Sequence, residues 1–585
     1  MNYDKISPAL AGALDDLQAH GRQGLEPHGH SLGLISTEPV HKPPRAVVFI
    51  RCDDAANLDH LAGEGIEING GGGRARTGIV PFMSLDRLSE DDAVQFINPA
   101  RRLRLHMDVA PGKVGVPPFR LRTGMTGQGV VVGVVDSGIE PLHPAFDARI
   151  LRIWDQTIPG PGVIEGRYGA ELTGDLQQIS RDTVGHGTHV AGIAAGADPT
   201  YGGIAPEATI LVVKTDLLDA HVADGVRYVF RVAGELGLPA VVNLSLGSHG
   251  DAHDGTDPLS TVIDEQVGPG RIVCCSAGNE GNDNIHGRVQ VAKGHTRSLA
   301  CSVPVPPPNI PSPSGPSPSA SFNGWYAGTD QMAVAVVAPS GAGTPFQTVI
   351  TGGSPARVYT LTEGSVRIAT PRPDPANGDH NFLVDILPIA PTGTQTTPGI
   401  WRLRIRGDEV DEGRVDVWSI DGTVAQFTGR ALQDSLKIGS PGAASAAVTV
   451  GSYTTRVEWV DLMGHAQQAG FELDTVTDFS SEGPRRDSLP KPDLIAPGAM
   501  IASSLSVNSG IFPEMLIDDL NTLKAGTSMS SPFVAGLVAL LLQREPDLDP
   551  DAVKGLLRAH CSVPGRTPGT YDPKWGYGLI DVQGL

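Results

Sequence analysis

Two separated parts of the chain alternate short, continuously apolar runs with longer segments that have helical spacing. The runs at 130–135 and 210–214 carry almost no polar residue, which is typical of strands covered on both faces. Strands that alternate with helices in this way predict a parallel sheet with right-handed crossovers, so we expect an α/β fold. Further strands are expected at 240–246, 272–276 and 444–451, and helices at 186–197, 222–235, 259–267, 528–544 and 550–560.

A different pattern, in which apolar and polar residues alternate singly, interrupts this α/β part. It follows a proline-rich stretch that begins after Val303, and it predicts the short strands of a β-sandwich. We therefore expect residues 291–434 to be an inserted domain between the halves 119–290 and 435–585 of one core domain. The expected strands of the insert lie at 332–337, 346–351, 365–369, 381–387, 401–405 and 414–419.

The N-terminal part of the chain has yet another order of elements. Residues 44–108 have the pattern βαββαβ of a small α+β unit. Its strands are expected at 45–52, 66–68, 77–82 and 96–105, with short helices at 57–63 and 85–94. Residues 1–43 are assigned to an N-terminal extension, either ordered or a tail.

The charge of the chain narrows the choice of partners. Of its 585 residues, 44 are Lys or Arg and 65 are Asp or Glu, which gives a formal net charge of −21. Such a surface repels phosphate backbones and anionic lipids, so neither nucleic acid nor a membrane is expected as a partner. The net charge alone does not identify a substrate.

The cysteines and the N-terminus both bear on the cellular compartment. The five cysteines are odd in number and scattered without CxxC spacing, which argues against a disulfide framework and against zinc. The first residues lack a basic head followed by an apolar stretch, and no span is long enough to cross a membrane. A cytoplasmic location is the resulting expectation.

Two polar residues stand where an α/β sheet builds its sites. Asp136 ends an apolar strand, at the edge where such sheets bind ligands. His186 begins a helix of small residues, GHGTHVAGIAAG, which allows close packing under a cleft. A carboxylate that orients a histidine is one half of a site for nucleophilic catalysis. Taken alone, Asp136 fits an ordinary turn equally well, and His189 is expected to pack or hydrogen-bond rather than to bind zinc.

The other half of such a site needs a nucleophile and an oxyanion donor. Ser528 lies at the start of the longest apolar helix, where the partial positive charge of the helix end favours an oxyanion. Asn279 ends an apolar strand, in the segment Ser-Ala-Gly-Asn-Glu-Gly. Its side-chain amide can donate to the oxyanion together with the Ser528 backbone N–H. The alternative for Ser528 is an ordinary helix cap.

The four segments together resemble the subtilase family (subtilisin-like, S8) of serine peptidases. VVDSGIEPLHPAF, GHGTHVAGIAAG, SAGNEG and GTSMSSPFVAG occur in the order that the family has, and the resemblance covers about residues 120–290 and 435–585. It implies a subtilisin-like parallel sheet flanked by helices, with Asp136, His186 and Ser528 as catalytic triad and Asn279 as oxyanion donor. It also implies a substrate cleft with Ser245, Leu246 and Gly247 on one wall and Ser276, Ala277 and Gly278 on the other. These small residues suggest an open pocket that admits large apolar side chains.

Two further features are similar to particular subtilases. The unit at 44–108 resembles a subtilase propeptide, which would block the cleft through a C-terminal strand around 101–109 and be removed by self-cleavage nearby. The β-rich insert is similar, in position and pattern, to the jelly roll of the clostridial germination subtilases. The resemblance thus implies a self-processed zymogen, with an intracellular processing role if the expected location holds.

Three functions stay open from the sequence. The first is an active endopeptidase that cleaves protein or peptide substrates and has its own propeptide-like unit as inhibitor. The second is a catalytically silent binding or regulatory protein with the same fold, although no triad residue is lost. The third is an esterase, against which the strand-pairing segment Ser245-Leu246-Gly247 argues. No cofactor is expected to be required, no metal site is assigned, and structural calcium stays open because no EF-hand spacing is found.

For the loop that holds His249 and His253 with Asp251 and Asp254, the alternatives are a metal site or structural duties in the loop and in capping, and the structural duties are favoured.

Overall fold

The computed structural model of the chain describes residues 43–53, 56–61, 65–68, 75–99, 109–304, 320–350, 354–389, 396–420 and 425–585, with scattered positions between residues 2 and 25. The chain divides into two compact units, residues 1–105 and 106–585. No helix of the described part is both long and apolar enough to cross a membrane.

The smaller unit is built on a four-stranded antiparallel sheet with the strand order β2-β3-β1-β4. Its buried face carries alternate residues such as Ala46, Val48 and Ile50 of β1, as a sheet with one covered face requires. The described elements are β1 (Arg45–Cys52), β2 (Glu67–Ile68), β3 (Ala75–Pro81), α2 (Leu85–Glu90) and β4 (Val94–Pro99).

The sequence boundary at residue 44 does not separate this unit from the N-terminal extension. Ile6, Leu10 and Leu14 are buried in the same core as the sheet. Their spacing of four residues is that of one helical face, so the sequence pattern itself indicates an ordered helix before residue 44. The expected inhibitory strand at 101–109 falls outside the described residues except for Val109, which begins α3 (Val109–Lys113).

The larger unit contains a ten-stranded sheet in the order β27-β28-β24-β21-β10-β9-β5-β8-β6-β7. Its strands are parallel except for the edge pairs β6–β7 and β27–β28, so the predicted α/β fold is confirmed. The strands are β5 (Val131–Asp136), β6 (Ile150–Asp155), β7 (Ala170–Leu172), β8 (Thr209–Lys214), β9 (Ala240–Leu244), β10 (Arg271–Ser276), β21 (Val448–Thr454), β24 (Leu494–Ala499), β27 (Cys561–Ser562) and β28 (Leu579–Ile580).

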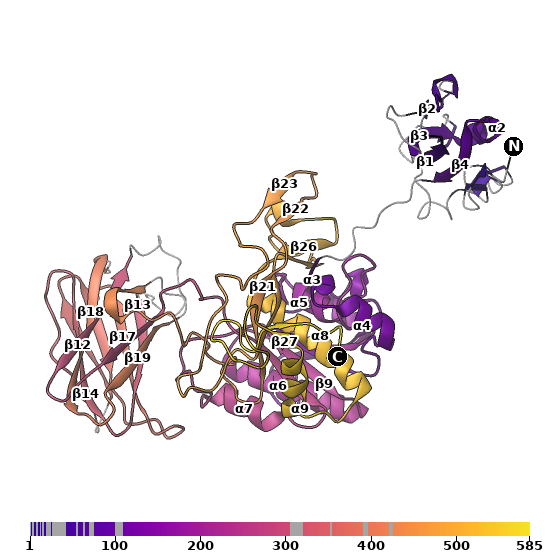
Figure 1. Cartoon of the computed structure of the whole chain (residues 1–585). Helices are drawn as coiled ribbons and strands as arrows, with labels where there is room; N and C mark the ends of the chain where they lie inside the picture. The colour runs from indigo at the N-terminus through magenta and orange to yellow at the C-terminus, as the bar shows by residue number, and fades with distance from the viewer. Residues whose placement is uncertain are drawn as a thin grey trace. The chain divides into compact units, whose positions relative to one another are not determined.

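Helices cover both faces of this sheet (Figure 1). Alternate residues of β5 point to opposite sides: Val132 and Val134 join the core with α5 and α8, whereas Val131 and Val135 join the core with α6. The helices of this unit are α3, α4 (Val116–Thr123), α5 (His186–Ala195), α6 (Asp219–Leu236), α7 (Pro258–Gln266), α8 (Thr527–Arg544) and α9 (Pro550–Ala559).

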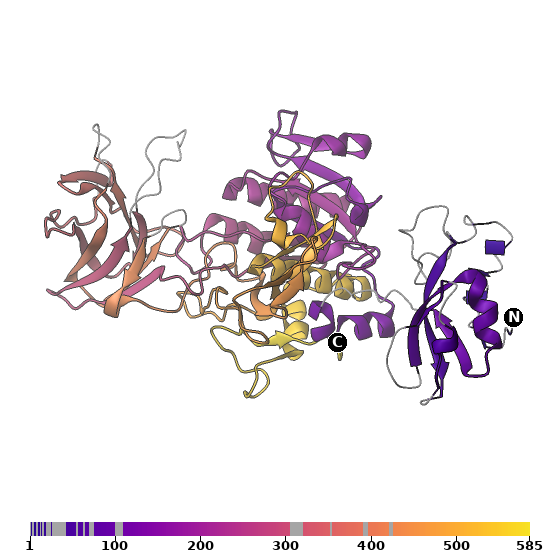
Figure 2. The same cartoon turned by 90° about the horizontal axis from the view of Figure 1, so that it is seen from above.

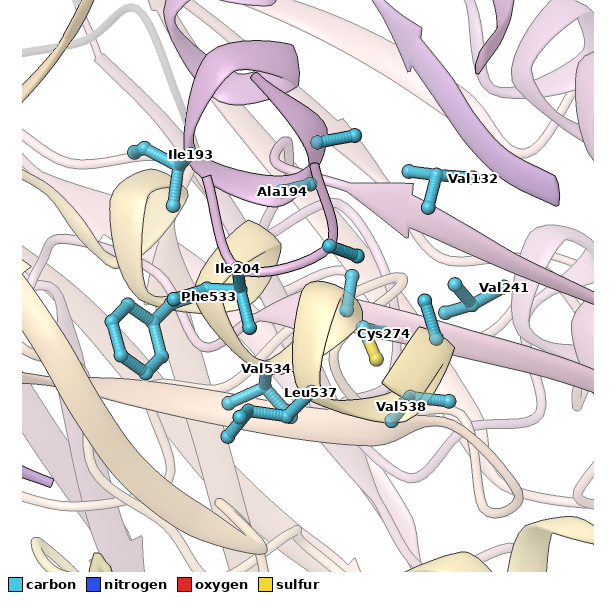
Figure 3. Packing of buried hydrophobic residues seen from close by; sticks show 14 of the residues in the cluster. Val132, Ile193, Ala194, Ile204, Val241, Cys274, Phe533, Val534, Leu537 and Val538 are labelled. Atoms are coloured by element: carbon cyan, nitrogen blue, oxygen red, sulfur yellow. The ribbon is translucent and has the colours of Figure 1, made fainter. Parts of the chain in front are cut away.

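Helix α8 packs on one face of the sheet (Figure 3). It is buried over nearly its whole length, because it packs on the sheet and also against α5. Figure 3 shows the side chains of this contact: Phe533, Val534, Leu537 and Val538 of α8, Ile193 and Ala194 of α5, Ile204, and Val132, Val241 and Cys274 of the sheet.

Two antiparallel sheets that share one hydrophobic core form the predicted β-sandwich (Figure 2). Their strand orders are β11-β19-β13-β17-β16-β15 and β14-β18-β12-β20. The first strand already starts at His286, before the expected boundary at 291. The strands are β11 (His286–Gln290), β12 (Thr296–Val303), β13 (Ala320–Tyr326), β14 (Gln331–Val337), β15 (Ala356–Leu361), β16 (Gly364–Ala369), β17 (His380–Leu387), β18 (Gly399–Glu409), β19 (Arg414–Ser419) and β20 (Gln426–Thr428).

One expected strand of the sandwich does not form. Within 346–350, the described part of that segment, Gln347 alone pairs with Val334, as an isolated bridge. Pro345 has no N–H and interrupts the ladder next to this bridge, which is why the alternating pattern did not produce a strand.

Candidate active site

Asp136 and His186 meet at the carboxyl edge of the sheet. Asp136 is the last residue of β5 and is 2% exposed, and His186 is the first residue of α5. The Nδ1 atom of His186 donates to Oδ1 of Asp136 at 2.8 Å. The same oxygen accepts the backbone N–H of Ser137 at 2.7 Å. The carboxylate thus fixes the histidine ring and leaves Nε2 to exchange a proton.

A buried carboxylate that the sequence analysis missed holds the start of α5. Asp182 accepts hydrogen bonds from the backbone N–H groups of Gly185 and Thr188, at 2.8 and 2.9 Å, and from the hydroxyl of Ser137 at 2.9 Å. These bonds tie the N-terminus of α5 to the end of β5. The signal was present in the sequence, because an acidic residue just before a helix satisfies its first N–H groups.

Opposing effects act on the protonation of His186. Burial alone would lower its pKa, but the negative charge of Asp136 and the hydrogen bond to it hold the pKa above the ordinary value of 6.5. His189, one turn further on, differs: burial lowers its pKa to about 3, and its Nε2 donates to the carbonyl of Ile501 at 3.0 Å. It is thus a neutral, hydrogen-bonded residue of the core, as predicted.

Ser528 is the second residue of α8 and lies beside the strand wall. Its hydroxyl donates to the carbonyl of Ser245 at 3.3 Å, and the Ser245 hydroxyl donates back to the Ser528 carbonyl at 2.8 Å. No hydrogen bond joins Ser528 and His186, both of which are described. Catalytic hydrogen bonds are often long before substrate binds, so the missing bond is compatible with a nucleophile–base pair formed by Ser528 and His186.

The amide of Asn279 is oriented by the residue before the nucleophile. Its Oδ1 accepts the backbone N–H of Thr527 at 2.8 Å and lies 3.0 Å from the Thr527 hydroxyl. Because the oxygen is engaged, the nitrogen Nδ2 is the group that can donate elsewhere. Thr527 was not singled out in the sequence, although it belongs to the Gly-Thr-Ser motif.

One pocket of about 200 Å³ brings the predicted cleft residues together. Ser528 and Asn279 line it, and so do both predicted walls. The lining residues are Ser245, Leu246, Gly247, Ser248, His249, Ser276, Ala277, Gly278, Asn279, Glu280, Gly439, Ser440 and Ser528.

The pocket is more polar than its small wall residues suggested. Glu280 and His249 both line it, with His249 Nε2 3.3 Å from Glu280 Oε2. Burial alone would raise the pKa of Glu280, but the hydrogen bond and charge of His249 hold it below the ordinary value. A carboxylate therefore lies at this end of the pocket, and the expected fit for large apolar side chains stays a prediction.

The stacked rings of His249, His253 and Trp418 connect the pocket with the sandwich. His253 Nδ1 donates to the carbonyl of Asp251 at 3.1 Å, so its Nε2 accepts from His249 Nδ1 at 3.0 Å. The His253 ring lies 3.9 Å from that of Trp418 in β19, nearly parallel to it. These hydrogen bonds agree with the structural duty in the loop that was expected for His249 and His253. No group of three or more His, Cys, Asp or Glu side chains among the described residues is arranged to hold a metal ion.

The site combines an aspartate–histidine pair, a serine at a helix N-terminus and an oriented amide at the edge of a parallel sheet. This combination is typical of the class of serine hydrolases with an α/β fold. A sequence profile described as the Subtilase family matches residues 127–301 and 356–578, more than half of the chain. The chain belongs to the subtilase family.

Curated relatives match it over parts of their length. The serine protease AprX of Bacillus subtilis (strain 168) is 37% identical over 146 residues, which cover 24% of this chain and 31% of that protein. The minor extracellular protease Vpr of the same organism is 25% identical over 466 residues, 74% of this chain and 48% of Vpr. The chain thus spans less than half the length of either.

Among solved structures, the CspB protease of Clostridium perfringens is similar with a TM-score of 0.64 and 24% identity. The match covers 80% of this chain and 95% of that chain. The predicted subtilisin-like fold and the resemblance to the clostridial proteins are confirmed at the level of the fold. A jelly-roll order of strands in the insert stays a prediction.

Proposed function

We propose that the chain is a serine endopeptidase that hydrolyses peptide bonds through an acyl-enzyme. The observation that carries this proposal is the Asp136–His186 hydrogen bond of 2.8 Å, on a subtilase fold whose pocket is lined by Ser528 and Asn279. In the reaction, His186 Nε2 takes the proton of the Ser528 hydroxyl while Oγ bonds to the substrate carbonyl carbon. Asp136 stabilises the resulting imidazolium.

The oxyanion that forms needs two donors. Asn279 Nδ2 is one, and the backbone N–H of Ser528 is the other, since the first N–H groups of a helix have no partner within it. When the carbonyl re-forms, the C–N bond breaks and His186 gives its proton to the leaving amine. Water, deprotonated by His186, then attacks the acyl-enzyme and releases Ser528.

The segment Ser245-Leu246-Gly247 favours a peptide over an ester as substrate. It forms one wall of the pocket beside Ser528, where an extended peptide can pair with it as an added strand. Substrates whose acyl part is an extended peptide offer this wall regular N–H and C=O groups, which a simple acyl ester lacks. They should therefore be cleaved with higher kcat/KM than substrates with the same leaving group and a short acyl group.

The smaller unit serves, in this proposal, as propeptide and intramolecular inhibitor. Its sheet and core are those of a separate compact unit, residues 1–105, and self-cleavage is expected near residues 100–118. A processing role in the cytoplasm completes the proposal. The five cysteines are all buried and no disulfide joins them, which suits a reducing compartment.

Fluorophosphonate labelling and intact mass test these statements together. Wild type should bind one probe molecule and lose its N-terminal unit, whereas Ser528→Ala should do neither. Ser530→Ala is the matched control, because its buried hydroxyl has no hydrogen-bond partner in the described structure, and it should behave as wild type.

Each outcome addresses a different part of the proposal. If wild type is labelled but stays whole, the enzyme stands and the zymogen is refuted. If wild type is neither labelled nor cut, the chain is a silent binding protein of this fold.

A further inference from the structure

A groove of about 810 Å³ lies in the inserted sandwich, beside the edge strand β11. This edge groove is lined by residues 288–293, 297–298, 410 and 430–431, the last two from the short helix η7 (Gly429–Ala431). None of these residues lines the pocket at Ser528. Sites for ligands commonly have volumes of about 300–1,000 Å³, so the edge groove is large enough for a ligand of its own.

The described walls of the edge groove carry four cationic side chains and no acidic one. The cations are Arg288, Lys293, Arg297 and Arg430. The whole chain has a net charge of −21, but residues 286–431 contain eleven Lys or Arg and eleven Asp or Glu. All of the net negative charge therefore lies outside the insert, so an anionic ligand meets less repulsion here than elsewhere on the chain.

Two of the four cations have carboxylate partners. Lys293 forms an ion pair with Glu409. Arg288 donates through Nε to Oδ1 of the buried Asp416 at 2.6 Å, but Arg414 donates to the other oxygen of the same carboxylate at 2.7 Å. One negative charge thus faces two arginines, and this cluster keeps an excess of positive charge.

Arg297 and Arg430 have no carboxylate partner within the described part of the chain. Arg297 donates to the carbonyl oxygen of Thr296 at 3.4 Å, which is an uncharged group, and Arg430 makes neither a hydrogen bond nor an ion pair there. Helix η7 contacts β12, so the two guanidinium groups line the same space. Their like charges repel each other, and a bound anion relieves this repulsion.

The floor of the edge groove is apolar and fixed in place. Val289, Val291 and Ala431 line it and are at most 9% exposed, because they belong to the core that the two sheets share. Such a floor favours a ligand that has an apolar part beside its negative charges. An inorganic anion would contact the arginines alone.

Carboxylates beside apolar side chains are typical of acidic segments of proteins. A guanidinium group binds a carboxylate through two parallel hydrogen bonds, so Arg297 and Arg430 can each hold one acidic side chain. A nucleic acid also carries negative charges, but it is a long polyanion that the acidic remainder of the chain repels. The edge groove therefore favours a short acidic peptide segment.

We propose that the edge groove binds an acidic, partly apolar segment of a partner protein. Arg297 and Arg430 hold its carboxylates, and Val289 and Val291 contact its apolar residue. For a peptidase the partner is a protein substrate, which the sandwich holds outside the cleft. This role rests on the proposed function, but binding to the groove tests the site without catalysis.

The probe for this site is a fluorescent peptide that contains Glu-Leu-Glu between short stretches of glycine and serine. Its binding is measured by fluorescence anisotropy with the full chain carrying the inactivating Ser528→Ala substitution. Exchange of both Glu for Gln, or of Leu for Ser, should weaken binding by about tenfold or more. A single-stranded oligonucleotide should bind more weakly than the Glu-Leu-Glu peptide.

The decisive variants are Arg297→Glu and Arg430→Glu. Each should weaken binding of the probe by about tenfold or more, since repulsion replaces a charge-assisted hydrogen bond. The matched control is Arg357→Glu, which makes the same change of charge on strand β15, away from the groove. It should alter binding by less than about twofold. All three arginines are exposed, so the variants should fold, and their unfolding temperatures check this.

Four results would overturn the inference. The probe does not bind, or Arg357→Glu weakens binding as much as the two groove variants, which would indicate attraction to the overall charge. The oligonucleotide binds as tightly as the peptide, or a neutral substrate peptide displaces the probe, which would place the probe in the cleft. If the probe binds through both arginines and the active protein cleaves no peptide, the inference stands and the peptidase function fails.

Discussion

The hydrogen bond between Asp136 and His186 determines the pH range in which the site can accept a proton. The histidine acts as a base only when neutral, and its pKa lies above 6.5. Hydrolysis should therefore be present at alkaline pH and be lost as the pH falls through this raised pKa. Its acid limb should lie at higher pH than that of an ordinary histidine.

Removal of the charge of Asp136 should move this limb. In Asp136→Asn the pKa of His186 loses the effect that raises it, so the limb of kcat/KM against pH should shift to lower pH. The rate at the plateau should fall by about 10⁴-fold, because the carboxylate no longer holds the histidine in the tautomer whose Nε2 accepts a proton. A limb that stays at the pH of wild type would show that another group titrates.

Thr527 offers a test of the oxyanion donor without touching it. Thr527→Val keeps the shape but removes the hydroxyl, which lies 3.0 Å from Asn279 Oδ1 and accepts the Gly278 N–H at 3.2 Å, so the amide should be less well oriented. We expect kcat to fall by at least roughly 2- to 10-fold, the worth of one hydrogen bond, with a smaller change in KM. Thr527→Ser, which retains the hydroxyl, should stay close to wild type. A rise in KM alone would instead assign Thr527 to substrate binding.

At the residue scale, the sequence was most informative where chemistry concentrates in short motifs. Asp136, His186, Asn279 and Ser528 each carry a local signature, and the structure brings them to one edge of the sheet. The contact between His249 and Glu280 could not be predicted in this way. It arises where two distant loops meet, and neither loop has a pattern that specifies the other.

Among the elements, helix α8 shows how close packing fixes the position of the nucleophile. A Cβ added at Gly536 would lie 2.5 Å from Ile204 Cβ and 2.9 Å from the carbonyl oxygen of Ala194. Although alanine is the better helix former, Gly536→Ala should therefore lower the free energy of unfolding by about 1–3 kcal/mol. Denaturant unfolding in the Ser528→Ala background measures it without self-digestion.

Gly555 in α9 is the matched position. Nothing lies within 4 Å of a Cβ built there. Gly555→Ala should then stabilise the protein by about 0.5–1 kcal/mol through helix propensity. Equal effects of the two substitutions would contradict the packing described for Gly536.

The strands that could be predicted are those buried on both faces. In β5 and β8 every central residue is apolar, so the pattern is unambiguous. Strand β24 was not predicted because it contains Pro497 and Gly498, residues that argue against a strand in isolation. Strand β6 was not predicted because Arg152 interrupts its apolar run. Tertiary burial overrides local preference in both.

On the scale of the whole molecule, the two units should unfold separately. All six tryptophans lie in the larger unit, at positions 154, 325, 401, 418, 459 and 575. Leu88 is fully buried in the core of the smaller unit, so Leu88→Ala should destabilise that unit by about 2–5 kcal/mol.

Calorimetry and fluorescence together check this prediction. In the Ser528→Ala background, Leu88→Ala should lower the temperature of one calorimetric transition, while the change in tryptophan fluorescence keeps its midpoint. A joint shift of both signals would mean that the units unfold as one.

The order of the site residues along the chain has a consequence for synthesis. Asp136, His186 and Asn279 precede the sandwich, whereas Ser528 follows Asn279 by about 250 residues. At translation rates of roughly 5–20 residues per second, the ribosome takes about 10–50 s to pass from the oxyanion donor to the nucleophile. Throughout that interval the nascent chain contains the base without a serine for it to activate, so it cannot attack its neighbours on the same polysome.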